Sequence, residues 1–70
     1  MNIKYEILIY WSQEDECFIA EVPELPGCMA HGNNYKDALK NIESASKLWV
    51  KTAKEIGREI PEPKGKLYYA

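Results

Sequence analysis

The feature that most constrains this chain is an apolar stripe at helical spacing in its second half. An apolar residue recurs every three or four positions, at Tyr35, Ala38, Leu39, Ile42, Ala45, Trp49, Ala53 and Ile56. Such spacing puts all of them on one face of a helix. Asn34 suits the N-cap, Asp37 three residues later completes a shortened capping box, and Gly57 suits the position after the helix. The sequence therefore predicts one helix over residues 34–57.

The first half of the chain alternates apolar and polar residues with a period of two. Residues 3–11 and residues 17–22 both show this pattern, rich in β-branched and aromatic side chains. The pattern is typical of strands that bury one face. Residues 12–16, between the two runs, are polar. We therefore expect two strands joined as a hairpin.

Prolines and glycines then mark a turn and a short third strand. Pro23 cannot donate a hydrogen bond to a sheet, so the second strand should end there. Pro26 and Gly27 suit the two central positions of a type II turn. Residues 28–31 are long enough for a short strand, and Gly32 ends it.

Together these elements predict a single α+β domain over residues 1–70. A small antiparallel three-stranded sheet occupies residues 1–31, and one long helix covers one of its faces. Residues 58–70 form a proline-rich exit, in which residues 66–70 can add a short fourth strand. A chain of 70 residues is long enough for one domain only.

The cysteine and histidine content favours a reduced protein without a metal site. Two cysteines and one histidine are too few for a closed tetrahedral site, so we expect neither a metal nor a cofactor. No secretory leader and no apolar stretch of about 20 residues is present, which favours a cytoplasmic protein with free thiols and no membrane contact. A disulfide between Cys17 and Cys28 is the less favoured alternative.

One face of the predicted sheet should remain uncovered. It carries Leu8, Tyr10, Cys17 and Ile19, which alternate with the residues expected to face the helix. A cluster of exposed apolar residues on so small a protein usually marks an interface, although single surface apolar residues are common. Because small domains bury little core, we expect a homodimer or a higher homo-oligomer formed through this face.

The order of these motifs resembles the HicB-like antitoxin family. The matching parts are Phe-Ile-Ala at residues 18–20, Val-Pro-Glu-Leu-Pro-Gly-Cys at residues 22–28, the Gly-Asn-Asn cap at residues 32–34 and Ile-Pro-Glu-Pro at residues 60–63. With the long helix, they cover roughly residues 5–63. Each motif alone is weak, but their order and spacing together are fairly specific.

The resemblance implies a partial ribonuclease H-like fold and a partner. That partner is a HicA-like toxin, a small basic ribonuclease whose catalytic site the antitoxin covers. Many members of the family carry a C-terminal DNA-binding domain. This sequence stops at Ala70, so direct DNA binding is not expected of this chain alone.

A catalytic role is not expected. Metal-dependent nuclease chemistry needs several carboxylates converging on Mg²⁺, and Glu6 should point away from the helix that carries Glu43. His31 has no serine or carboxylate beside it in sequence. Cys28, three residues before His31, should face the opposite side of the strand. We therefore predict that the chain is not an enzyme.

The charges are divided along the chain and suggest where a partner binds. Residues 1–33 carry one basic and six acidic residues, a net charge of −5, whereas residues 34–58 carry six basic and three acidic ones, a net of +3. Five carboxylates in and near the hairpin turn and the proline-rich loop are candidate toxin contacts: Glu14, Asp15, Glu16, Glu21 and Glu24. They would attract a basic surface, although surface carboxylates also keep small proteins soluble.

The lysines of the helix form a second charged group, at Lys36, Lys40, Lys47, Lys51 and Lys54. A solvated helix face explains them better than a nucleic-acid contact, because no aromatic residue is interleaved. Two functions therefore remain. The first is a non-catalytic antitoxin, and the second is a stand-alone dimeric accessory or regulatory domain that binds a small ligand or nucleic acid.

Overall fold

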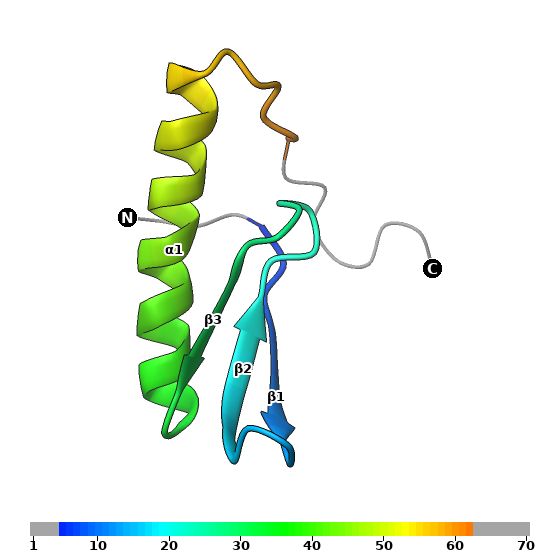
Figure 1. Cartoon of the computed structure of the whole chain (residues 1–70), viewed down its shortest axis with the longest axis vertical. Coiled ribbons are helices and arrows are strands. Elements are labelled where there is room, and N and C mark those ends of the chain that lie inside the picture. The colour runs from blue at the N-terminus through cyan, green and yellow to red at the C-terminus, as the bar shows by residue number, and fades with distance from the viewer. Residues whose placement is uncertain (1–4, 63–70) are drawn as a thin grey trace.

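The computed structural model describes residues 5–62, which form one antiparallel sheet and one helix (Figure 1). The strands are β1 (Leu8–Ser12), β2 (Cys17–Glu21) and β3 (Met29–Gly32), in the spatial order β1-β2-β3, and the helix is α1 (Tyr35–Glu55). The predicted α+β architecture is confirmed. The wider likeness to ribonuclease H stays a prediction.

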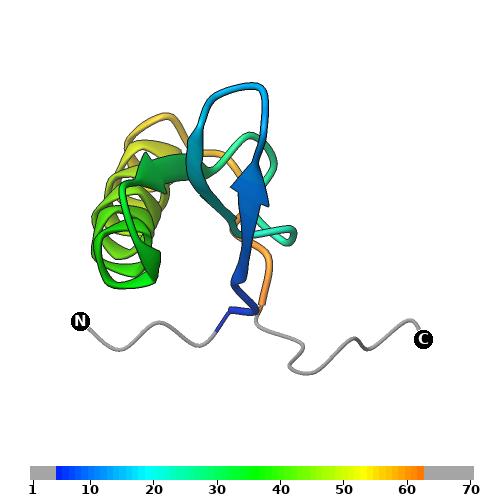
Figure 2. The same cartoon turned by 90° about the horizontal axis from the view of Figure 1, so that it is seen from below.

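The register of the strands decides which residues meet α1. Ile9 lies opposite Ala20, and Ala20 lies opposite Ala30, in a row that faces the helix. Because side chains alternate along a strand, the neighbouring row with Tyr10 and Ile19 faces the other way. Seen along the helix, α1 lies beside β3 and farthest from β1 (Figure 2). Among the described residues, no element covers the sheet face opposite α1, which we call the outer face.

The core lies between the sheet, the proline-rich loop and α1, and consists of Ala20, Val22, Leu25, Cys28, Ala38 and Ile42. The loop is closed by a hydrogen bond from the backbone N–H of Val22 to the carbonyl of Cys28 (3.1 Å). Within it, the N–H of Cys28 donates to the carbonyl of Leu25 (3.0 Å), and Gly27 has φ +79°. These are the marks of the predicted type II turn, with Pro26 and Gly27 at its centre.

Several strand boundaries differ from the prediction, most of them by a single residue. β1 begins at Leu8, although the alternation starts earlier, because Leu8 is paired with the last residue of β2. Opposite residues 5–7 the chain has already turned away at Pro23, which has no N–H to offer. β3 covers Met29–Gly32, so Gly32 is part of the strand and does not merely follow it.

Gly32 also permits close contact between β3 and the start of α1. A Cβ at this position would lie 2.4 Å from the backbone nitrogen of Ala38 and 2.8 Å from the carbonyl carbon of Asp37. No side chain fits into that space. The absence of a side chain therefore sets how closely β3 and the helix approach.

Both predicted helix caps are present, but the helix itself is shorter than residues 34–57. Asn34 Oδ1 accepts a hydrogen bond from the N–H of Asp37 (2.8 Å), as an N-cap should. At the other end, the N–H of Arg58 donates to the carbonyl of Ala53 (2.8 Å) around Gly57, which has φ +74°. This Schellman arrangement ends the helix at Glu55.

The predicted helical stripe is only partly buried. Tyr35, Leu39 and Ile56 are exposed, because a sheet of three strands is too narrow to cover the whole apolar arc. Ser46 takes a fully buried place instead, and its hydroxyl donates to the carbonyl of Ile42 (2.7 Å). This bond satisfies the hydroxyl inside the core.

The exit from the helix returns to the first strand. The hydroxyl of Tyr5 donates to the carbonyl of Pro61 (2.5 Å), which holds the exit beside the start of β1. The fourth strand expected at residues 66–70 lies outside the described residues.

Candidate protein-binding surfaces

Three of the candidate acidic residues lie together in the turn between β1 and β2. Glu14, Asp15 and Glu16 are all exposed there. The turn is ordered by Ser12, whose hydroxyl donates to Asp15 Oδ2 (3.1 Å) and accepts from the N–H of Asp15 (3.3 Å). We call these three residues the acidic turn, because the turn places their three carboxylates together at one end of the sheet.

The other two candidate acidic residues lie at the opposite end of β2. Glu21 is its last residue and accepts a hydrogen bond from the hydroxyl of Tyr10 (2.6 Å), and Glu24 is in the proline-rich loop. Four steps along a strand span about 13 Å. The structure therefore separates the five carboxylates into two groups and does not gather them into one patch.

The outer face brings together the four residues predicted for self-association. Tyr10 is the cross-strand partner of Ile19. Cys17 pairs with Ser12 two rows away in one direction, and Leu8 pairs with Glu21 two rows away in the other. Leu8 and Tyr10 are exposed, and Cys17 and Ile19 are half-buried.

β3 adds two residues to the outer face beyond the four that were predicted for it. Ile19 is paired with His31, and Glu21 with Met29, so both β3 side chains join the rows already described. The signal was present, because Cys28 points into the core and the alternation then turns Met29 and His31 outward.

The residues considered for catalysis are not brought together. His31 is exposed, whereas Cys28 is buried behind the sheet with its Sγ 3.6 Å from Ser46 Oγ. Cys17 and Cys28 are both free thiols. Among residues 5–62, no group of three or more His, Cys, Asp or Glu side chains is placed to hold a metal ion, and this includes Glu6 and Glu43.

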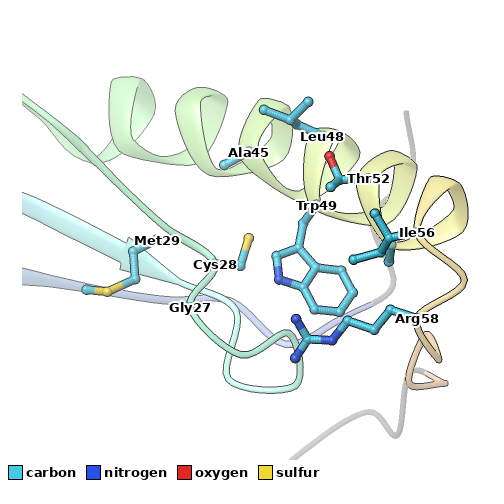
Figure 3. A pocket seen from close by; sticks show the side chains of 10 residues that line it. Gly27, Cys28, Met29, Ala45, Leu48, Trp49, Thr52, Ile56 and Arg58 are labelled. Atoms are coloured by element: carbon cyan, nitrogen blue, oxygen red, sulfur yellow. The ribbon is translucent and has the colours of Figure 1, made fainter.

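A groove of about 300 Å³ lies between the C-terminal half of α1 and the start of β3 (Figure 3). It is lined mainly by apolar side chains, among them Met29, Ala45, Leu48, Trp49 and Ile56, together with the hydroxyl-bearing Thr52. The Trp49 indole N–H donates to the carbonyl of Pro26 (2.9 Å), and the Arg58 guanidinium stacks 5.1 Å from the centre of its ring. We call this surface the α1 groove.

The apolar stripe predicted from the sequence is too narrow to include the α1 groove. Leu48, three positions after Ala45, widens the apolar arc of the helix towards β3. Leu48 and Ile56 remain 64% and 69% exposed. An arc wider than one stripe was the available signal of a second apolar surface.

Comparison with known proteins supports the resemblance drawn from the motifs. A family model described as the HicB-like antitoxin of bacterial toxin–antitoxin systems matches residues 5–67. The chain belongs to the HicB-like antitoxin family. A toxin–antitoxin role in general follows, and the family implies a toxin partner.

Relatives of this HicB-like chain extend over most of its length. The UPF0150 protein Ta0767 of Thermoplasma acidophilum is 36% identical over 59 residues, which is 84% of each chain. The UPF0150 protein ssl0259 of Synechocystis is 34% identical over 84% of this chain and 80% of its own length. A UPF0150 protein of Helicobacter pylori is 37% identical over 38 residues, about half of each chain. No solved structure gives a significant match.

The residues that carry the family resemblance shape the proline-rich loop and the ends of α1, and they lie between the candidate binding surfaces. Pro23, Pro26 and Gly27 build the closed loop that packs against Trp49. Gly32 lets β3 approach α1 closely, and Asn34 and Gly57 mark the two ends of the helix. Within residues 5–62, no helix has the length and apolar character needed to cross a membrane.

Proposed function

We propose that this HicB-like chain is a non-catalytic antitoxin that binds a small, basic HicA-like ribonuclease and covers its RNA-binding site. The observation that carries the proposal is the acidic turn, in a chain whose family belongs to toxin–antitoxin systems. Glu14, Asp15 and Glu16 are exposed on an ordered turn. Carboxylates held in this way present a negative potential similar to that of the RNA backbone.

Electrostatic attraction accounts for fast and selective association. Opposite potentials steer two proteins together and raise the association rate, and the effect weakens as salt screens exposed charges. Glu21 and Glu24, at and beyond the far end of β2, which is about 13 Å long, offer a second contact. Because both turns are closed by hydrogen bonds, little backbone ordering is needed on binding.

Inhibition by coverage requires no chemistry from this chain. Cys28 is buried and His31 lies on the other side of the sheet, so the two do not form a nucleophile and base pair. The free thiols of Cys17 and Cys28 are consistent with the reducing environment of the cytoplasm, where such a toxin would act.

The outer face is our candidate for self-association. Leu8, Tyr10, Cys17 and Ile19 form an apolar patch on adjacent strands, and the central pair is Tyr10 and Ile19. Replacing Ile19 with Lys should weaken a dimer formed through this face, since the charge would be buried in the interface. An unchanged sedimentation coefficient in this variant would rule out the outer face.

The antitoxin proposal is tested with the toxin itself. The probe is the product of a small reading frame next to the gene for this chain, basic and with a single histidine. Its cleavage of RNA is measured with and without the purified chain. We expect the chain to suppress cleavage, and Glu14→Lys with Glu16→Lys to weaken this suppression most at low salt.

The control places the same charge change elsewhere. Glu55 and Glu59 are also exposed but lie at the far end of α1 and in the exit, so their replacement by Lys should leave inhibition unchanged. Equal loss in both double variants would show that only net charge matters and would contradict the acidic turn as the contact. If neither a neighbouring toxin nor inhibition is found, the accessory-domain alternative is favoured.

A further inference from the structure

The α1 groove is an apolar hollow that the proposed function does not use. Small residues form its floor, among them Cys28 and Ala53, which are only 4% and 2% exposed. Large apolar side chains form its rim. In Figure 3, Leu48 and Ile56 extend from α1, while Met29 lies across from them on β3. The hollow therefore exists because small side chains lie between large ones.

Among the described residues, Arg58 is the only charged one that lines the groove. Its guanidinium stacks 5.1 Å from the centre of the Trp49 ring, and the indole N–H of Trp49 is held by the carbonyl of Pro26 (2.9 Å). The backbone of Arg58 is also fixed, since its N–H donates to the carbonyl of Ala53 (2.8 Å). A cation therefore has a defined position at one side of the apolar hollow.

The N–H groups of this guanidinium are available to a ligand. Stacking uses the flat face of the group and leaves its five N–H donors at the edge. Glu55 and Glu59, the nearest acidic residues in sequence, do not line the groove, and within residues 5–62 neither forms an ion pair with Arg58. A guanidinium binds a carboxylate through two parallel hydrogen bonds. We therefore expect the groove to favour a ligand that carries a carboxylate.

The edge of β3 beside the groove is too short to add a peptide strand. The bond from Val22 to the carbonyl of Cys28 fixes the alternation of the ladder, so the backbone groups of Met29 and His31 point to the outer edge of the strand. The side-chain amide of Asn41 already donates to the carbonyl of His31 (2.7 Å). One remaining residue does not make a ladder. A ligand must therefore meet the groove through side chains.

The size of the groove suits a small molecule with an apolar body. Its volume of about 300 Å³ equals the share of about ten water molecules in the liquid, at ~30 Å³ each. This is the lower end of the range for small-molecule sites, and it accommodates a body of roughly eight to ten non-hydrogen atoms. A nucleic acid is a poorer match, because it binds through several cations and one lines the groove. A neutral or cationic ligand would leave the guanidinium without an acceptor.

We propose that the α1 groove binds a small amphipathic acid, whose apolar body lies between α1 and β3 and whose carboxylate is bound by Arg58. The proposal rests on charge complementarity, because one exposed cation meets an otherwise uncharged and mainly apolar lining. The site is at the other end of the sheet from the acidic turn. Met29 pairs with Glu21, the last residue of β2, whereas the acidic turn precedes β2. The site therefore does not depend on toxin binding, and its test needs no toxin.

The probes are three small molecules that share a phenyl ring and a chain of equal length but differ in the head group: phenylbutyrate, phenylbutanol and phenylbutylamine. In a Trp11→Phe background of the full chain, Trp49 is the only indole, so its fluorescence reports on the groove. We expect phenylbutyrate to change this fluorescence saturably, with a Kd of about 1 mM or lower. Phenylbutanol should bind about tenfold more weakly and phenylbutylamine more weakly still, because only the acid pairs with Arg58.

Variants separate the head-group contact from the apolar contact. Arg58→Gln should weaken phenylbutyrate binding about tenfold and leave phenylbutanol binding unchanged, and Arg58→Lys should restore part of the loss. The matched control is Lys54→Gln, which removes an exposed cation of the same helix that does not line the groove. Thr52→Leu fills the groove and should weaken binding of acid and alcohol alike. Ser44→Leu, at an exposed position outside the groove, should weaken neither. Circular dichroism checks that each variant keeps its helix.

The proposal is overturned if phenylbutyrate produces no saturable change in Trp49 fluorescence, or if phenylbutyrate and phenylbutylamine bind equally well. Equal effects of Arg58→Gln and Lys54→Gln would also overturn it, since the acid would then respond only to net charge. Equal losses in Thr52→Leu and Ser44→Leu would place the bound molecule outside the groove and contradict the site. A change in Trp49 fluorescence on dilution of the protein alone would show that a second copy occupies the groove in place of an acid.

Discussion

At the scale of single residues, Gly32 and Gly27 show two different reasons for glycine. Gly27 has φ +79° in the type II turn, but a Cβ there would meet nothing within 4 Å. Gly32 has no positive φ, yet a Cβ there would collide with the backbone of Ala38. The first glycine is required by the local conformation and was predicted from the Pro-Gly pair. The second is required by a contact with a distant element.

This difference predicts unequal costs for alanine at the two positions. Gly32→Ala should lower the free energy of unfolding by about 3 kcal/mol or more, because the helix backbone cannot move aside cheaply. Gly27→Ala should cost about 1 kcal/mol, from left-handed strain alone. Urea unfolding of both variants, followed by circular dichroism, measures the two costs. Equal losses would contradict the close approach of β3 and α1.

The N-cap gives a second prediction at this scale. Asn34→Ala removes the acceptor for the N–H of Asp37 and should lower the free energy of unfolding by about 1 kcal/mol. Asn33→Ala, one position earlier at an exposed site, should change it by less than about 0.5 kcal/mol. The same urea titration distinguishes them. A larger loss of stability in Asn33→Ala than in Asn34→Ala would show that Asn34 is not the N-cap.

At the scale of elements, Trp49 connects α1 to the proline-rich loop. Its indole N–H reaches the carbonyl of Pro26, and Arg58 covers its ring from the helix exit. The loop therefore has two supports, the bond between Val22 and Cys28 at its base and the Trp49 contact at its tip. The Trp49 contact cannot be recognised from a single stretch of sequence, because Trp49 and Pro26 are 23 positions apart in the chain.

We expect Trp49→Phe to lower the free energy of unfolding by about 1–2 kcal/mol. The phenyl ring has no N–H for Pro26 and offers a weaker surface to Arg58. The control is Trp11→Phe, which keeps an aromatic ring against Phe18, where the present ring centres are 5.2 Å apart. Trp11 is exposed, so this change should cost less than about 0.5 kcal/mol. Thermal unfolding monitored by circular dichroism compares the two variants. A larger loss of stability in Trp11→Phe than in Trp49→Phe would show that the Trp49 contacts do not stabilise the loop.

At the scale of the whole molecule, the two ends of the described chain are joined through Tyr5 and Pro61. Burial raises the pKa of the Tyr5 hydroxyl, and the negative charges of Glu24 and Glu62 raise it further. The pKa of Tyr10 is also raised, mainly because its hydroxyl donates to Glu21. In both cases the folded protein holds the phenolic proton more tightly than the unfolded chain does.

Stability should therefore fall in alkaline solution. Above the unfolded value of about 10.0, the unfolded chain loses these protons first, so the free energy of unfolding decreases as the pH rises towards the folded pKa values. Tyr5→Phe should lower stability at neutral pH, through loss of the bond to Pro61, and should make the alkaline decrease shallower. Urea titrations between pH 8 and about pH 11 test this. An alkaline decrease of unchanged steepness in Tyr5→Phe would contradict the assignment.

Many of the features predicted correctly depend on neighbours in sequence. The alternation up to Glu21, the Pro26-Gly27 turn and the Asn34 cap all involve hydrogen bonds or rotations within a few residues. Local conformational preferences therefore suffice to specify them. The same holds for the assignment of Leu8, Tyr10, Cys17 and Ile19 to one face, because a strand alternates strictly.

The tertiary structure alone decided which apolar residues are buried and how the surfaces are arranged. It exposed Tyr35 and Leu39, buried Ser46, delayed the start of β1 to the residue opposite the end of β2, separated Glu24 from the acidic turn and opened the α1 groove. Burial depends on how wide the neighbouring element is and on which residues it brings close. A sequence pattern specifies the face of a helix or strand, but the width of the surface that covers it is known only once the elements have packed.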